Sequence, residues 1–78
     1  MTKSSPLADQ PIVIRAEPIE LCQLLKFAGL VESGGAAKQA ISDGLVQLNG
    51  AVETQKRKKI MAGDRVSFDG QTLVVSLA

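Results

Sequence analysis

The sequence predicts an α+β fold in which a short helix pair packs on a small, largely antiparallel sheet. Apolar residues recur at helical spacing between positions 21 and 41, and from position 46 they alternate with polar residues as in half-buried strands. A helical part followed by a strand-rich part is typical of α+β domains. The 78 residues suffice for one core, so we expect a single domain over residues 12–78.

Residues 1–11 are expected to form a flexible leader outside that core. They contain two prolines, two adjacent serines and no periodic apolar pattern. Residues 12–16 are rich in β-branched side chains and predict a short strand. Pro18 follows, and its fixed φ suits the first turn of a helix.

Two apolar stripes predict the helix pair. The first stripe ends at Gly29 and consists of Leu21, Leu24, Leu25 and Ala28. Ser33 is a good N-cap for the second helix, and Gly44 is its C-terminal stop. The second stripe consists of Ala37, Ala40 and Ile41, and the opposite face carries Gly35, Lys38, Gln39 and Ser42.

The strands are predicted by alternation and by turn signals. Val46 and Leu48 alternate with polar residues, and Asn49-Gly50 is a strong signal for a two-residue hairpin turn. The returning strand is expected to start near Ala51 and to run toward a basic segment. Turns at residues 62–64 and 69–70 then delimit two further strands.

Composition excludes several classes of function. The net charge of +1 argues against a polycation whose whole surface binds nucleic acid. No stretch approaches the roughly 20 apolar residues of a membrane span, and the N-terminus lacks a signal peptide, so we expect a cytoplasmic protein with no membrane partner. One cysteine and no histidine predict neither a disulfide nor a metal or other cofactor. The chain has only two aromatic residues, Phe27 and Phe68, which argues against aromatic surfaces on which single-stranded bases would stack.

The start of the second helix is the first candidate site. Ser33, Gly34 and Gly35 place a cap and two glycines where backbone amides and the helix dipole favour an anion. Lys38 lies one turn later and adds an ammonium group to the same site. Plain N-capping explains Ser33 equally well, and packing against a neighbouring helix would also explain the glycines.

The second candidate is a run of cations, Lys56, Arg57, Lys58 and Lys59, with no acid between Glu53 and Asp64. Consecutive like charges need either full solvation or a polyanionic partner, so a solvated loop and a nuclear-localisation signal are the alternatives. Lys26 is the other cation of the helix pair, and its spacing alone favours a solubilising surface role. Asn49 would stand beside the helix pair, as a polar contact or as a turn residue.

An enzyme is not expected from these residues. Cys22 flanks the apolar stripe of the first helix and is predicted to be a packing thiol. Cysteine nucleophiles need a base, and the chain has no histidine. Asp64 and Asp69 lie in turn signals without a recognisable pocket.

Four segments together resemble a known family. They are residues 20–26 (ELCQLLK), 32–38 (ESGGAAK), 43–50 (DGLVQLNG) and 62–66 (AGDRV). Their order and spacing resemble the RNA-binding domain named after small-subunit ribosomal protein S-four, the αL motif, over residues 12–77. Within that family the chain is similar to the small stand-alone bacterial proteins of the YbcJ type.

The resemblance implies binding of structured RNA, commonly ribosomal or transfer RNA, through the helix pair and the adjoining sheet edge. The residues that it implicates are Ser33, Gly34, Gly35, Lys38, Gln39 and Asn49. The chain departs from the broader family pattern at three positions: Glu20 and Gly34 stand where many members have Arg, and Cys22 where many have Asp. Lys26 and the run at 56–59 are the candidate replacements for these missing charges.

The leading hypothesis is therefore a free-standing, monomeric and non-enzymatic protein that binds folded RNA and associates with ribosomal particles. Its rival is a protein-interaction adaptor whose basic surface binds an acidic partner.

Overall fold

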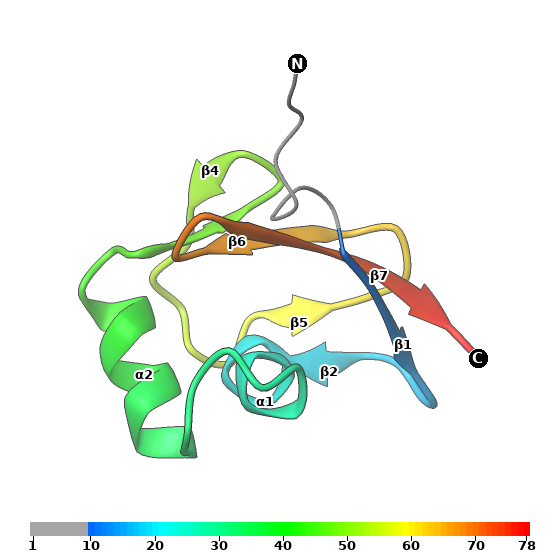
Figure 1. Cartoon of the computed structure of the whole chain (residues 1–78), viewed down its shortest axis with the longest axis horizontal. Coiled ribbons are helices and arrows are strands. Elements are labelled where there is room, and N and C mark those ends of the chain that lie inside the picture. Colours follow the sequence, from blue (N-terminus) through cyan, green and yellow to red (C-terminus); the bar gives the residue numbers. More distant parts are fainter. Residues whose placement is uncertain (1–9) are drawn as a thin grey trace.

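A five-stranded sheet forms one layer of the structure, and two helices with a two-stranded sheet form the other (Figure 1). The computed structural model describes residues 10–78. Its elements are β1 (Gln10–Ile14), β2 (Ile19–Glu20), α1 (Leu21–Phe27), α2 (Gly34–Ser42), β3 (Val46–Leu48), β4 (Ala51–Val52), β5 (Lys59–Ile60), β6 (Arg65–Phe68) and β7 (Gln71–Leu77). The predicted α+β class is confirmed.

The larger sheet has the strand order β1-β7-β6-β3-β4. All its pairs are antiparallel except β1 with β7, which run parallel from Gln10 opposite Leu73 to Ile14 opposite Leu77. The smaller sheet joins β2 to β5, with Ile19 opposite Ile60. The prediction of a largely antiparallel sheet is thus correct, and the parallel pair at its edge is an addition to it.

The predicted leader is two residues too long. Gln10 and Pro11 belong to β1, and the Gln10 side-chain amide donates a 3.1 Å hydrogen bond to Oε1 of Gln71. Pro11 is tolerated because β1 is an edge strand, where a missing amide need not break the ladder. The rest of the predicted leader, positions 1–9, lies outside the described residues.

The placement of Pro18 in a helix was wrong. The helix α1 begins at Leu21, and the residues between it and Pro18 form β2 instead. The backbone stays extended there because Ile19 and Glu20 pair with β5, and this pairing brings the segment before β5 against the start of α1.

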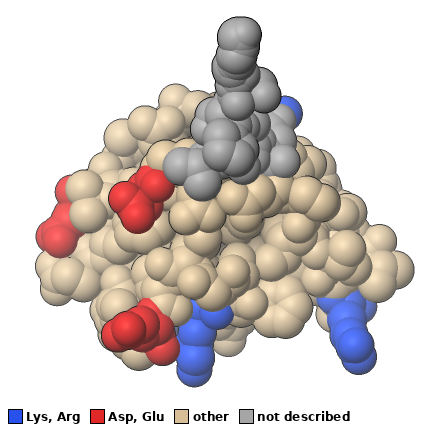
Figure 2. Space-filling view, in the orientation of Figure 1, with Lys and Arg blue, Asp and Glu red and all other residues tan. Residues whose placement is uncertain are grey.

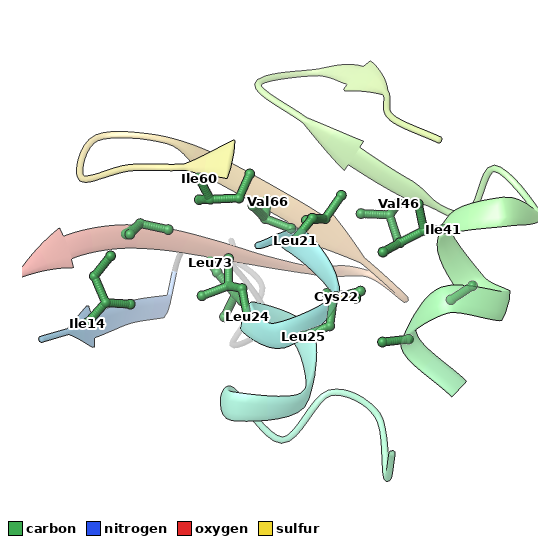
Figure 3. Close-up of a cluster of buried hydrophobic side chains, with 13 residues drawn as sticks. Ile14, Leu21, Cys22, Leu24, Leu25, Ile41, Val46, Ile60, Val66 and Leu73 are labelled. Atoms are coloured by element: carbon green, nitrogen blue, oxygen red, sulfur yellow. The ribbon is translucent and has the colours of Figure 1, made fainter. Parts of the chain in front are cut away.

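The core lies between the two layers (Figure 3). Leu21, Leu24 and Leu25 of α1 are fully buried and face the larger sheet and α2. Their partners include Ile14, Ile41, Val46, Ile60, Val66 and Leu73. Burial of a Leu side chain stabilises a fold by about 1.5–3 kcal/mol, so α1 is fixed in place despite its seven residues.

The cap and the stop of α2 and the hairpin turn after β3 lie where the sequence predicts them. Oγ of Ser33 accepts a 3.1 Å hydrogen bond from the amide of Ala36, which confirms the N-cap. Gly44 follows the helix with a φ of +75°, which suits a residue without a side chain. Asn49 and Gly50 also have positive φ and join β3 to β4 in a two-residue turn.

Candidate nucleic-acid interface

The basic run forms a turn against the start of α1. The amide of Leu21 donates a 2.9 Å hydrogen bond to the carbonyl oxygen of Lys58, and the amide of Cys22 donates one of 3.1 Å to that of Lys56. The first amides of a helix lack partners within it, so the carbonyls of the run supply them. The returning strand that was predicted to start near Ala51 and to run toward the basic segment is short: β4 ends at Val52, and the next strand, β5, begins at Lys59.

All four side chains of the basic turn, residues 56–59, are exposed. Arg57 lies over the two helices, whereas Lys59 belongs to β5 and stands opposite Glu20 of β2. The turn therefore presents only part of its charge to the helix pair.

A hollow of about 230 Å³ lies where α1, α2 and the basic turn meet. We call it the cationic hollow, and its lining residues are Glu20, Cys22, Gln23, Lys26, Gly34, Lys38 and Arg57. Lys26 comes from α1, Lys38 from α2 and Arg57 from the turn. Three cations from three segments against one acid give this hollow a net positive charge.

A second hollow of about 380 Å³ continues from the first. Lys38 and Arg57 line both, and the second adds Ser42, Thr54, Gln55 and Lys56. Hydroxyl, amide, ammonium and guanidinium groups are the usual donors to phosphate oxygens. The two hollows together could therefore contact successive phosphates of a nucleic acid strand.

The row of α2 that faces these hollows is Gly34, Lys38 and Ser42, which are four residues apart. Gly35 and Gln39 lie on the neighbouring row. Nε2 of Gln39 donates a 2.9 Å hydrogen bond to Oδ1 of Asp43 within that row. The structure thus brings Gly34 and Lys38 to the hollows and leaves Gly35 and Gln39 beside them.

The two glycines at the start of α2 are not explained by packing. A Cβ atom placed on Gly34 would have no neighbour within 4 Å, and one on Gly35 would meet only Oγ of Ser33 at 3.9 Å. Of the explanations offered by the sequence, close packing against another helix is therefore excluded. Binding of an anion at this helix start stays a prediction.

Asn49 is used within the protein. Its side-chain amide donates a 3.2 Å hydrogen bond to Oδ1 of Asp64, and its Oδ1 accepts one of 2.9 Å from the amide of Arg65. It lines neither hollow, and neither do Lys58 and Lys59. A contact of these three residues with a nucleic acid stays a prediction that the geometry does not favour.

Some lining residues had no place among the predicted sites. Gln23 is one turn before Lys26 on the exposed face of α1, so its position could have been predicted from helical spacing. Thr54 and Gln55 precede the basic turn and carry no comparable signal in the sequence.

Figure 2 shows one face of the molecule, in the orientation of Figure 1. On this face blue side chains stand apart below α1 and at the corner between β1 and β2, and red side chains are dispersed over the left half. Among the described residues that are visible on this side, no continuous basic patch is seen. Within residues 10–78, no helix is both long and apolar enough to cross a membrane.

Comparison with known proteins identifies the family. The family described as the S4 domain matches residues 12–76, which is most of the chain. The chain belongs to the S4 domain family.

Two bacterial relatives of this S4 domain share much of its sequence. The "Putative RNA-binding protein YbcJ" of Escherichia coli (strain K12) is 56% identical over 57 residues, which are 73% of this chain and 81% of the relative. The "Probable ribosome maturation protein RlbA" of Bacillus subtilis (strain 168) is 38% identical over 60 residues, 77% of this chain and 84% of the relative. The predicted resemblance is confirmed.

The fold is shared as well. The solution structure of E. coli YbcJ, described as revealing an αL motif involved in RNA-binding, matches with a TM-score of 0.65 and 45% identity. The match covers 97% of this chain and 95% of that one. The helix pair of this S4 domain is therefore the αL motif.

The three departures from the broader S4 pattern meet at one place. Glu20, Cys22 and Gly34 all line the cationic hollow. Arg57 and Lys26 line it too, so cations are supplied there from other positions of the chain. Of the candidate replacement charges, the structure thereby brings Lys26 and Arg57 to the site of the missing ones.

Proposed function

We propose that this S4 domain protein binds structured RNA, ribosomal RNA in the first place, without catalysing a reaction. The observation that carries the proposal is the convergence of Lys26, Lys38 and Arg57 on the cationic hollow. Neutralisation of phosphates by Lys and Arg releases counterions and supplies most of the affinity for a nucleic acid backbone. A localised site of this kind agrees with a net charge of only +1.

The relatives support RNA as the partner. YbcJ is named as an RNA-binding protein, and its solution structure is described by an RNA-binding motif with the same fold. RlbA is named for ribosome maturation, which supports association of the present chain with ribosomal particles. An acidic protein partner has no comparable support from named relatives.

The residues near the hollow suit binding better than catalysis. Cys22 lines the hollow but is 6% exposed, and the chain has no histidine to deprotonate it. Residues 10–78 contain no group of three or more His, Cys, Asp or Glu side chains placed to hold a metal ion. We therefore assign the protein a binding role.

Two double variants of equal charge test the proposal. Lys38→Gln with Arg57→Gln removes two cations of the cationic hollow, and Lys58→Gln with Lys59→Gln removes two cations outside it. Affinity for a ribosomal RNA hairpin should be measured by fluorescence anisotropy at several salt concentrations. The first variant should lower the slope of log affinity against log salt by up to about 1.8, since each duplex phosphate contact contributes about 0.9. The second should lower it much less.

Equal losses from both variants would show that binding follows overall charge and not this site. Unchanged affinity in both variants would show that the cationic hollow does not bind RNA. Sedimentation of the tagged protein with ribosomal particles at low salt, and its release at high salt, tests the ribosomal association separately.

A further inference from the structure

We infer that an unpaired base of the bound RNA occupies an apolar hollow beside the cationic hollow, stacked on Phe27. This inference rests on the proposed RNA-binding function and adds a base-binding site to it. The apolar hollow has a volume of about 260 Å³ and lies between the end of β1, the start of β2 and α1. Its lining includes Ile14, Arg15, Pro18, Ile19, Gln23 and Phe27.

The exposure of Phe27 is the first observation. Its side chain is 60% exposed although it is the largest apolar residue of α1, while its neighbours Leu24 and Leu25 are fully buried. Covering a water-exposed aromatic ring with a flat partner lowers the free energy, so such a ring at the wall of a hollow favours binding of that partner. The presence of only two aromatic residues argued against base stacking, but one of the two, Phe27, is exposed and available for it.

Continuity between the two hollows is the second observation. Gln23 lines both of them, so they are adjacent on the surface. The exposed residues of α1 are Gln23, Lys26 and Phe27. Their spacing of three and four residues makes them neighbours on one helix face. An amide, an ammonium and an aromatic ring therefore stand side by side, which matches the edge, the phosphate and the face of a nucleotide.

Charge favours a nucleic acid over a protein side chain as the occupant. Among the residues of the described chain that line the apolar hollow, Arg15 is charged and none is acidic. Arg15 thus adds a cation to the apolar hollow, and Lys26 adds one to the cationic hollow beside it. Proteins that recognise RNA commonly stack splayed bases of loops and bulges on aromatic rings and bind their edges with polar side chains. Gln23 is suited to that second role.

The test compares two RNA hairpins of the same stem, each closed by a non-nucleotide linker so that no loop base is present. One is fully paired, and the other has a single unpaired nucleotide in the stem. Phe27→Ala should lower affinity for the bulged hairpin by about tenfold, which is within the range known for loss of one base–aromatic stack, and should leave the paired hairpin unchanged. Phe27→Trp should keep the affinity for both. Val52→Ala is the matched control, because Val52 is 58% exposed and lies on β4.

Fluorescence gives a readout that does not depend on affinity. A 2-aminopurine at the unpaired position should be quenched on binding to the wild-type protein and to Phe27→Trp, but not to Phe27→Ala at saturating protein. Circular dichroism should stay native in all variants, since Phe27 contributes little buried surface. Gln23→Ala should alter the preference among the four bases at the unpaired position.

Three outcomes separate this inference from the proposed function. In the first outcome, the double variant Lys38→Gln with Arg57→Gln loses affinity for both hairpins, and Phe27→Ala has no effect. This outcome would overturn the base site and leave the RNA-binding function. An equal effect of Phe27→Ala on paired and bulged RNA would also overturn it, because the ring would then contact no unpaired base. No effect of either variant on either hairpin would overturn both, and would favour a protein segment as the occupant.

Discussion

The amide of Cys22 donates a 3.1 Å hydrogen bond to the carbonyl oxygen of Lys56, so main-chain atoms fasten the basic turn to the start of α1. The corresponding bond from Leu21 to Lys58 closes the turn on its other side. Arg57 lies between the two accepting residues and is thereby held over the helix pair. Both bonds are made by main-chain atoms, which a change of the side chains of the turn leaves in place.

Charge reversal of the basic turn should therefore abolish RNA binding and leave the fold intact. Replacing Lys56, Arg57, Lys58 and Lys59 together with Glu keeps both carbonyl acceptors. Exposed charges contribute roughly 0–1 kcal/mol each to stability, so circular dichroism should remain native. Affinity for structured RNA should fall below detection in an anisotropy titration. A native spectrum with unchanged affinity would mean that the run is a solvated turn without a binding role.

Glu20 should weaken RNA binding in the wild-type protein. It is the acid that lines the cationic hollow, and it stands opposite Lys59 across the small sheet. Glu20→Gln keeps the size of the side chain and removes its charge, so affinity should rise about twofold to fivefold, as expected for an interaction of ~0.5–1 kcal/mol. Asp69→Asn removes an equal charge at the turn between β6 and β7 and is the control. An equal gain in both variants would assign the effect to net charge.

Local signals explain why much of the fold was predictable. The Ser33 cap, the stop at Gly44 and the Asn49-Gly50 turn depend on residues within a few positions of one another, and the structure has each of them where the sequence places it. The apolar stripes of both helices are buried for the same reason. Lys26 and Lys38 could be predicted as candidate RNA-binding residues because they lie opposite those stripes.

Long-range pairing explains what could not be predicted. The parallel partner of β1 is β7, about sixty residues later, and no local pattern selects it. The shape of the basic turn is set by donors on α1, more than thirty residues earlier. Whether the Gly34 row or the Gly35 row of α2 faces the hollow depends on the side of α2 on which α1 packs. The sequence could therefore predict the helix start as a site, but not which of the two glycines lines the hollow.

Asn49 should matter for stability and not for RNA affinity. Asn49→Ala removes its two side-chain hydrogen bonds and strains a backbone with a φ of +52°, so unfolding by urea should show a loss of about 2–3 kcal/mol. Asn49→Gly keeps the backbone conformation accessible and should lose only about 1–2 kcal/mol. RNA affinity of both folded variants should equal that of the wild type. A folded Asn49→Gly variant with a tenfold weaker affinity would restore Asn49 as a contact residue.

The start of α2 allows the anion site to be tested at one-residue resolution. Gly34→Glu places a carboxylate in the cationic hollow, and Gly35→Glu places the same group on the neighbouring row. Both positions have room for a side chain. Glu is also favoured near a helix N-terminus and has a higher helix propensity than Gly, so neither variant should unfold the protein.

Gly34→Glu should lower affinity for a ribosomal RNA hairpin by at least tenfold, and Gly35→Glu should lower it by no more than about threefold, the effect of one added surface charge. Lys38→Gln alone should reduce the salt slope by about 0.9 if it removes one duplex phosphate contact. In the double variant of Gly34→Glu with Lys38→Gln the losses should not add, because little phosphate is left at the hollow for Lys38 to contact. Titrations of the wild type, the three single variants and this double variant at several salt concentrations measure all of these quantities. Equal losses from the two glutamates, or additive losses in the double variant, would show that Gly34 and Lys38 do not share a phosphate.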